Sequence, residues 1–371
     1  MSAATTQGVS VRGCCHVYCA LDIGFAVDLK RCAGLLQEAH EAYSFQHHAP
    51  APQWMNLQPA PLQVSQAMEP IRGSTFRTED KVTITVYDFG AVSVEYRIPL
   101  EGTLDRLAQL SSELYDNTQF AADARGRAES LLNAVRPAVK KPLIREEVED
   151  YLVFVIPDLG QGDRDVEQVV ADSGSALAQV LSSNTKPLSR QQQREELSGQ
   201  IAYYADDLTV ITWNAALVCG TRMEDVLTVL ELANVQLREL HYLDDQLDRS
   251  LQESYDVSDR AGSVRAGMQR IRTLMLDGQA FSEAVTNAFK PFPDAFLARV
   301  YALASRSLGL NQFDRSIREK LSLLNTLYTT LSDEADHERS VRLEWIVIIL
   351  ILIEIIMGLW DKVFPLLPHH W

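Results

Sequence analysis

The chain has 371 residues, enough for two domains and a sizeable hydrophobic core. Its 50 Asp and Glu outnumber its 34 Lys and Arg, which gives a formal net charge of −16. This charge argues against a general nucleic-acid binder, which would carry a basic stripe, and against simple adhesion to anionic lipid. The five cysteines form no regular framework, which is typical of a reducing compartment.

A cluster of thiols, GCCHVYC, lies at Gly13–Cys19. Three cysteines and His16 are close together in the sequence, but the C-x-x-C pairs of a zinc site are absent. If this stretch is a strand, neighbouring side chains point to opposite faces and most of the cluster cannot converge. We therefore expect no metal site here. The residues before the cluster lack the apolar stretch of a secretory signal.

Three stretches, from His16, Val82 and Leu208, share one pattern. Each begins with alternating β-branched and aromatic residues, breaks at small or polar residues, resumes as a short strand and then becomes helix-periodic. A further strand begins at Asp150. Strand–strand–helix units predict an α+β domain over residues 1–220, with a mainly antiparallel sheet and helices on one of its faces. Residues 44–70, rich in Pro, Ala and Gln, are predicted to form a flexible loop within it.

No motif in this domain specifies a catalytic or cofactor site. Asp88-Phe89-Gly90 matches a kinase tripeptide, but the glycine-rich loop and the other kinase motifs are absent, so a turn with a positive φ at Gly90 is the better interpretation. The acidic stretch Asp158–Asp165 lacks the spacing of an EF-hand and is interpreted as a solvated loop. Ser189 is expected to cap a helix. We expect no catalytic residue, no metal and no cofactor.

Residues 221–342 are predicted to form long helices. Two runs of apolar residues alternate spacings of 4 and 3, the pattern of a coiled-coil seam. Pro291 and Pro293 break the helix between them, which favours an antiparallel hairpin. The seams fit packing within one chain and self-association, and both are compatible. The first run is Val226, Leu230, Ala233, Leu237 and Leu240; the second, through which we expect a homo-oligomer, is Ile317, Leu321, Leu324, Tyr328, Leu331 and Ala335.

The run WIVIILILIEIIMGLW, from Trp345 to Trp360, is apolar on every helical face, as in a buried core helix or a lipid-embedded one. Its aliphatic side chains contribute about −5 kcal/mol to membrane insertion, more than the ~3 kcal/mol that Glu354 costs. Trp345 and Trp360 mark the two ends, where indole rings favour the head-group boundary. We expect a transmembrane helix at residues 343–364 and a short tail at 365–371, with a buried core helix as the alternative.

Arg339 and Arg342 precede this run and only Lys362 follows it, so the positive-inside rule predicts a cytoplasmic N-terminal bulk. The protein would be tail-anchored, with the lipid bilayer as a partner. Three roles are open for Glu354. It is hydrogen-bonded, in protonated form, to a neighbouring copy; it pairs with a cation on another membrane protein; or it is a neutral side chain without a task.

The C-terminal third resembles the end of the Rmd1/RMND-type family, named for being required for meiotic nuclear division. The matching stretches are Leu323–Asn325, Arg342–Ile348 and Ile353–Glu354, and VYCALDIGFAVDL and VYDFGAVSVEYRI resemble the family's N-terminal strands. The resemblance implies a membrane protein with no established enzymatic activity, whose mitochondrial relatives form large homo-oligomeric inner-membrane assemblies linked to organellar translation. It further implies a bacterial-like member of a family of unknown function, at the bacterial inner membrane.

Together these features predict a non-enzymatic scaffold that is held at the membrane. It self-associates and presents the α+β domain to a protein partner on the cytosolic face, with no direct contact to nucleic acid. The alternative is an enzyme or a nucleotide-binding regulator with an unrecognised site in the α+β domain.

Overall fold

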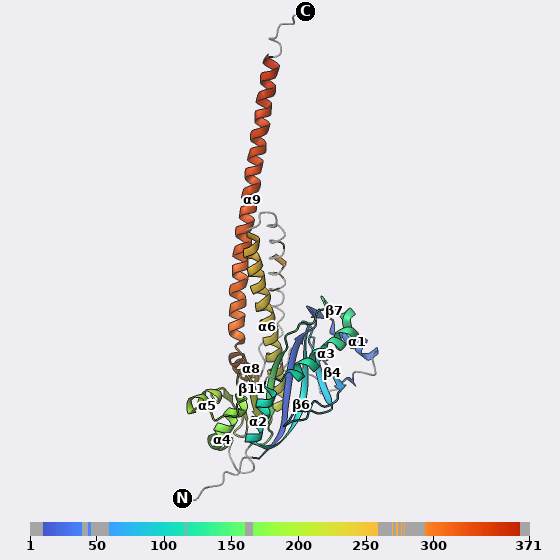
Figure 1. The fold of residues 1–371 in the computed structure, drawn as a ribbon, viewed down its shortest axis with the longest axis vertical. Coiled ribbons are helices and arrows are strands. Elements are labelled where there is room, and N and C mark those ends of the chain that lie inside the picture. The colour runs from blue at the N-terminus through green and yellow to red at the C-terminus, as the bar shows by residue number, and fades with distance from the viewer. Residues whose placement is uncertain are drawn as a thin grey trace, which may run out of the picture. The chain divides into compact units, whose positions relative to one another are not determined.

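The computed structural model describes residues 10–38, 44–45, 59–115, 117–159, 166–258, 269, 272–273, 276, 278 and 294–363 (Figure 1). The chain divides into two compact units. Unit 1 comprises residues 1–244 and 281–315, and unit 2 comprises residues 245–280 and 316–371.

Unit 1 is built on a nine-stranded sheet in the order β3-β4-β5-β6-β1-β8-β11-β10-β9. Its neighbouring strands pair antiparallel except β8 and β11, which pair parallel. A small second sheet pairs β2 with β7. The mainly antiparallel α+β architecture is the predicted one, and β3 and β4 lie inside the stretch predicted as a loop. The strands are β1 (Ser10–Asp22), β2 (Ala26–Val27), β3 (Ser44–Phe45), β4 (Leu62–Ala67), β5 (Lys81–Val86), β6 (Ala91–Thr103), β7 (Val139–Lys140), β8 (Glu149–Val155), β9 (Gln200–Ile201), β10 (Leu208–Ile211) and β11 (Ala215–Cys219).

The three predicted strand–strand–helix units are present. They are β1, β2 and α1 (Leu29–Glu38); β5, β6 and α2 (Leu104–Leu114); and β10, β11 and α6 (Met223–Ser258). The turn predicted between β5 and β6 is confirmed. Gly90 there has a φ of 101°, and a Cβ at this position would lie 2.0 Å from the carbonyl oxygen of Gly24. Glycine is thus required both for the backbone conformation and for the close approach.

Helices cover both faces of the large sheet, so the prediction of a single covered face is wrong. On the first face α2, α3 (Thr118–Val135) and α4 (Val166–Leu181) pack on β6, β1 and β11 over the main apolar core. The second face is covered by the first part of α6, and every residue of β1 from Cys15 to Asp22 is buried. Polar residues alternate along the strands on this face and lie beneath α6. Its apolar contacts form a separate cluster of Ala20, Tyr87, Phe89, Ala91, Leu232 and Val235.

The shorter helices begin at side-chain caps. The predicted cap at Ser189 is confirmed: its hydroxyl oxygen accepts the N–H of Gln192 at 3.2 Å at the start of α5 (Arg190–Glu196). Asp294 accepts two N–H groups, at 2.9 and 3.0 Å, at the start of α8 (Ala295–Ser307). A 3-10 turn, η1 (Arg136–Ala138), follows α3.

The two apolar seams lie on α6 and on α9 (Leu310–Val363). The five residues of the α6 seam are all buried. On α9, Ile317 and Leu324 are buried and Leu321 and Tyr328 are half-buried, while the side chain of Leu331 lies outside the described residues. Within unit 2, Lys320 Nζ lies 2.7 Å from Asp248 Oδ1 and joins the two helices. The proline-containing turn predicted between the helices lies outside the described residues.

In the described part of the chain, no helix has the length and apolarity that a membrane span requires. The predicted transmembrane helix at 343–364, the tail anchor and the inner-membrane placement are therefore wrong. The described apolar run of α9 extends from Leu343 to Met357, about 22 Å at ~1.5 Å per residue, against a hydrocarbon core of about 30 Å. It also carries two carboxylates, Glu344 and Glu354. The side chain of Trp360, expected at the far boundary, lies outside the described residues.

Candidate functional site

The second face of the sheet carries a layer of polar side chains beneath α6. On β1, Cys14, His16 and Tyr18 alternate with residues of the apolar core. The pairing of β1 with β6 sets His16 opposite Arg97 and Tyr18 opposite Glu95. Side chains that are opposite or diagonal on one face of an antiparallel pair contact each other. Alternation in two neighbouring strands, together with their register, therefore builds the polar layer.

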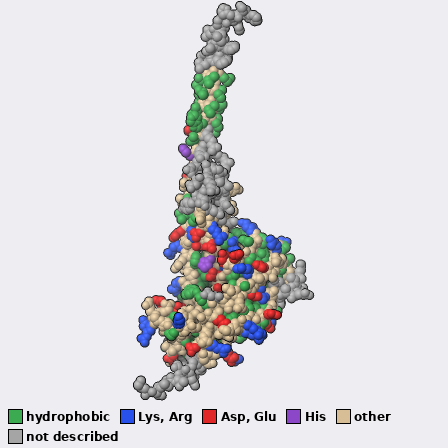
Figure 2. Space-filling model, in the orientation of Figure 1, with side chains coloured by type: hydrophobic (Ala, Val, Ile, Leu, Met, Phe, Trp, Pro, Cys, Tyr) green, Lys and Arg blue, Asp and Glu red, His purple; other side chains and the backbone are tan. Residues whose placement is uncertain are grey.

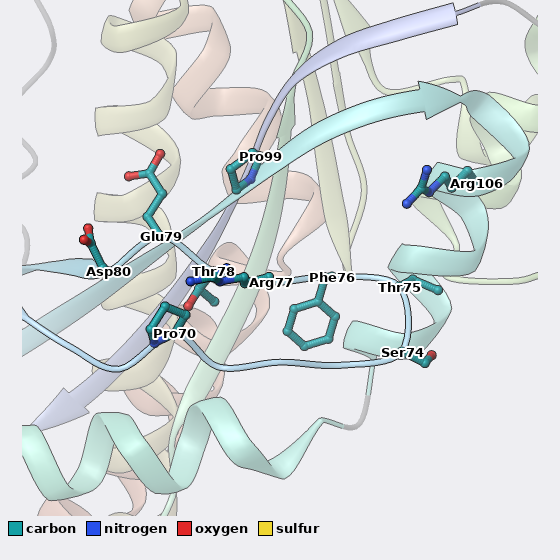
Figure 3. Close-up of a pocket in the computed structure, with 10 residues that line it drawn as sticks. All are labelled: Pro70, Ser74, Thr75, Phe76, Arg77, Thr78, Glu79, Asp80, Pro99 and Arg106. Atoms are coloured by element: carbon teal, nitrogen blue, oxygen red, sulfur yellow. The ribbon is translucent and has the colours of Figure 1, made fainter.

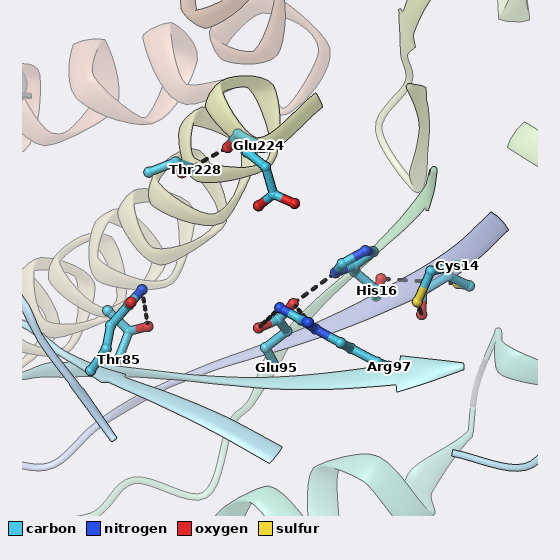
Figure 4. A network of polar contacts seen from close by, with 9 residues as sticks. Cys14, His16, Thr85, Glu95, Arg97, Glu224 and Thr228 are labelled. Carbon is cyan, nitrogen blue, oxygen red and sulfur yellow. Dashed lines mark hydrogen bonds and ion pairs between the residues drawn. The ribbon is translucent and has the colours of Figure 1, made fainter. Parts of the chain in front are cut away.

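An imidazole, a carboxylate and a guanidinium form the centre of this layer. His16 Nδ1 lies 2.7 Å from Glu95 Oε1, and Arg97 Nε donates to the same oxygen at 3.0 Å (Figure 4). His16 is 6% exposed and Glu95 is 8% exposed, so the pair is shielded from solvent. A charged pair in such a place is retained only with good geometry and extra hydrogen bonds, and Arg97 supplies these.

The two groups hold opposite charges. Burial by itself lowers the pKa of His16, but hydrogen bonds with Cys14 and Glu95 outweigh it and raise that pKa to about 9. Burial by itself raises the pKa of Glu95, but the hydrogen bond from His16 and the charge of Arg97 lower it to about 2. At neutral pH the centre therefore contains an imidazolium and a carboxylate.

Cys14 adjoins this centre on the side of the His16 ring that faces away from Glu95 (Figure 4). The Cys14 thiol donates to the carbonyl oxygen of Cys15 at 3.7 Å, and its interaction with His16 contributes to the raised pKa of that imidazole. Cys14 is half-buried, whereas the other four thiols are buried. Cys15 and Cys19 belong to the apolar core on the opposite face, as the strand alternation predicts. The described residues contain no group of three His, Cys, Asp or Glu side chains arranged to hold a metal ion.

Glu231 of α6 enters the same layer from above. It is 8% exposed, and its Oε1 has no hydrogen-bond partner among the described residues. Burial, and then the charge of Glu95, raise the pKa of Glu231 to about 7. Two carboxyl groups of one layer thus differ in pKa, because Glu95 is paired directly with His16 and Arg97 whereas burial dominates at Glu231.

A second polar cluster lies where β1 ends. Arg238 Nη2 lies 3.2 Å from Asp22 Oδ2, and Arg145 Nε lies 3.5 Å from the same oxygen. Neither carboxylate oxygen of Asp22 has a hydrogen-bond partner of good geometry among the described residues. Burial and the charge of Asp22 raise the pKa of Glu239 well above its usual range. Two neighbouring buried carboxyl groups do not both ionise, so Glu239 keeps its proton while the Asp22 carboxylate faces the two arginines.

An open hollow of about 680 Å³ lies beside the layer (Figure 3). It is formed by the segment that precedes β5, together with Pro99 of β6 and Arg106 of α2. Its charged residues are mixed, with Arg77 and Arg106 on one hand and Glu79 and Asp80 on the other. The hollow therefore has no charge of one sign that would specify a ligand.

None of these residues was predicted from the sequence to be functional. The residues that were selected from the sequence, Trp345, Glu354 and the seam from Ile317, lie on α9 and not in the polar layer. His241 of α6 is half-buried, and its Nδ1 lies 2.8 Å from Glu149 Oε2. The available signal was the polar residue at every second position of two strands, but the strand register needed to combine them was not in the sequence.

A comparison with family models decides the relationship of the chain. The model described as "Uncharacterized protein MJ0711, N-terminal domain" matches residues 12–225, more than half of the 371 residues. The chain belongs to this family. No curated protein and no solved structure matches the chain. The match gives no support to the narrower Rmd1/RMND-type assignment.

The region shared with the MJ0711 family runs from the start of β1 to the first turn of α6. It contains Cys14, His16, Glu95 and Arg97, together with the strands that position them. Glu231 and Glu239 lie beyond it. The family is itself uncharacterized, so its name assigns no activity to the polar layer.

Proposed function

We propose that this chain is a non-enzymatic assembly protein. Copies of the chain associate through α9 and present their α+β units to a protein partner. One observation carries the proposal: α9 exposes a continuous apolar run from Leu343 to Met357, seen as the band of hydrophobic side chains on that helix in Figure 2. Trp345 is 61% exposed and Met357 is 67% exposed. A contiguous apolar surface of this kind marks an interaction site.

The spacing of the apolar residues favours a second copy as the occupant. The seam of Ile317, Leu321, Leu324 and Tyr328 recurs, in steps of seven, at Trp345, Ile349, Leu352 and Ile356. Ile317 and Leu324 are already buried within one chain, whereas the recurrence of the seam is exposed. Copies aligned in parallel would bring the four exposed positions together. The spacing places Ile349 and Ile356 at a positions and Leu352 at a d position, a combination that favours two parallel helices.

The helix geometry also predicts where Glu354 would lie in such an assembly. At ~100° per residue, Glu354 lies on the side of the helix opposite Trp345, Ile349 and Ile356. A parallel bundle would therefore leave this carboxylate in water. The resemblance of this region to the Rmd1/RMND-type family, whose mitochondrial relatives form homo-oligomers, supports the same proposal.

Sedimentation of the full-length chain, over a range of protein concentrations and without detergent, tests the proposal. We expect a discrete oligomer, with two copies as the size that the seam favours. The double substitution Ile349→Lys with Ile356→Lys places charges in the seam and is expected to yield monomers. A matched control, Val347→Lys with Ile351→Lys, places the same charges on the other side of the helix and is expected to keep the oligomer.

Two results would contradict self-association. One is a wild-type chain that sediments as a monomer at every concentration. The other is a chain that forms a defined species only when detergent or lipid vesicles are added. In that case the apolar run would be covered by detergent or lipid and not by a second copy of the chain. If both double variants lost assembly equally, the seam would not be the surface through which the copies associate.

A further inference from the structure

We propose that Cys14, His16 and Glu95 form a reactive-thiol site that exchanges with low-molecular-weight disulfides. The proposal concerns unit 1 alone and does not depend on assembly through α9. It rests on a thiol, an imidazole and a carboxylate placed in sequence on one face of two paired strands. The site lies in the region shared with the MJ0711 family, and no sequence motif in that region indicates such an activity.

The positions of the three groups follow from strand geometry. Cys14 and His16 are two residues apart on β1, so their side chains share a face. The His16 ring lies between Cys14 and Glu95 (Figure 4), and its Nδ1 is 2.7 Å from Glu95 Oε1. Arg97 fixes the carboxylate from the other side through its Nε, at 3.0 Å. A thiol beside a base that a third group orients is the arrangement that activates a nucleophile.

A cation lies next to the Cys14 thiol. With its raised pKa, His16 is an imidazolium at neutral pH, and one of its N–H groups is engaged by Glu95. The remaining N–H is on the side of the ring toward Cys14 (Figure 4) and can stabilise negative charge that develops on its sulfur, and a cysteine beside a protonated histidine is the kind that reacts as a thiolate. The charge of Arg97 also interacts with Cys14. A half-buried cysteine among cations matches the surroundings of reactive thiols, whereas structural cysteines are buried and inert.

The site is open to a small reagent. Cys14 is the one half-buried thiol of the five. Its partner across the β1–β6 pair is Pro99, which also lines the hollow of about 680 Å³ (Figure 3). A disulfide seated at the near end of this hollow would meet the sulfur without displacing the core.

The chemical step is thiol–disulfide exchange. The Cys14 thiolate attacks one sulfur of the disulfide, a new S–S bond forms to Cys14, and the original S–S bond breaks. The leaving thiolate takes a proton from His16, which becomes neutral and donates its Nδ1–H to Glu95. Cys14 is thereby oxidised to a mixed disulfide and half of the reagent is reduced to a thiol. A second thiol in solution reverses the step.

Mass spectrometry of the folded full-length chain, treated with glutathione disulfide and then digested, tests this proposal. We expect a single adduct, at Cys14, and no adduct in Cys14→Ser. The rate for the wild type is expected to change little between about pH 6 and pH 8. An ordinary thiol would instead slow roughly tenfold for each pH unit below its pKa.

His16→Gln separates a positioned imidazolium from simple exposure. At about pH 6 the variant is expected to react at least roughly tenfold more slowly than the wild type and to regain the pH dependence of an ordinary thiol. Glu95→Gln, which removes a positioning residue, is expected to shift the profile in the same direction. An adduct on another cysteine, or a wild-type profile with the slope of an ordinary thiol, would overturn the proposal even if a variant failed to fold.

Discussion

The two faces of the large sheet are equally buried and differ in chemistry. On the first face, Val94, Tyr96 and Phe154 pack under α2, α3 and α4 in a core that is almost entirely apolar. On the second face, Glu95 and His16 alternate with those residues and meet α6. Burial of apolar side chains stabilises the fold at any pH, whereas burial of ionisable groups stabilises or destabilises it according to which proton is bound. Burial alone therefore does not show which face makes a contribution to stability that depends on pH.

A substitution on the first face should give the largest loss of stability, and this loss should not depend on pH. Phe154→Ala removes a side chain with 0% exposure near the end of β8. We expect the free energy of unfolding to fall by about 3–5 kcal/mol, because the variant loses transfer energy and leaves a cavity. Urea denaturation at about pH 5 and about pH 8 measures this loss, and equal losses are expected. Leu143→Ala, at a side chain that is 53% exposed, is the control and should cost less than about 0.5 kcal/mol.

The sequence was sufficient for the first face. Apolar residues at every second position from Val82 and from Leu208, followed by helical periodicity, predicted the strands and the helices that follow them. The turn at Gly90 and the cap at Ser189 were also predicted, because local chemistry specifies them. The sequence predicted helices on only one face of the sheet, and this was wrong. The second face is covered by α6, which is distant in sequence, and no local signal in β1 or β6 announces it.

The polar layer was not predicted for the same physical reason. The partnership of His16 with Glu95 needs the register of β1 against β6, and that of Glu231 with the layer needs the docking of α6. Each residue alone was compatible with a solvated surface. Similarly, the apolar run of α9 indicated a membrane span because its apolar composition was given more weight than its short length. Residue type alone does not distinguish a solvated strand face from a buried polar layer, or a membrane span from another apolar helix. Strand pairing distinguishes the first two, and the length of the apolar run distinguishes the others.

Removing one partner of the buried ion pair should give the next largest effect. Glu95→Gln leaves the His16 imidazolium without its carboxylate, and we expect a loss of about 3 kcal/mol in the free energy of unfolding near pH 6. The pKa of Glu95 is lowered in the folded state, from 4.5 to about 2. Its contribution is therefore present above about pH 4.5 and is lost as the pH falls through about 2. Denaturation curves from pH 6 to pH 3 should show the two proteins converging; a constant difference would contradict the assignment.

Glu231→Gln, in the same polar layer, should change the free energy of unfolding in the opposite direction and make the protein more stable. The pKa of Glu231 is raised in the folded state, from 4.5 to about 7, so the unfolded chain ionises first as the pH rises. Wild-type stability is therefore reduced progressively between those two values and stays reduced above them. We expect the variant to be more stable than the wild type by up to about 3 kcal/mol near pH 8 and equal to it near pH 4. Denaturation at both pH values measures the difference.

Destabilisation by Glu231→Gln at every pH would contradict this account, because it would mean that the carboxylate has a buried cationic partner. A useful control is Glu101→Gln, on the exposed part of β6, which should leave the stability unchanged within about 0.5 kcal/mol at both pH values.

The smallest effect compares one tyrosine on each face. Tyr96, on the first face, donates its hydroxyl to Asp123 Oδ2 at 2.7 Å, and Tyr151, which alternates with Leu152, donates to the carbonyl oxygen of Thr212 at 2.9 Å. Replacing either tyrosine by phenylalanine keeps the ring and removes one hydrogen bond, so we expect losses of about 1–2 kcal/mol for Tyr96→Phe and about 1 kcal/mol for Tyr151→Phe. The acceptor of Tyr96 is a charged group, so its loss should be the larger of the two, as urea denaturation near neutral pH measures. If instead Tyr151→Phe cost more than Tyr96→Phe, the carbonyl oxygen of Thr212 would not be the main partner of the Tyr151 hydroxyl.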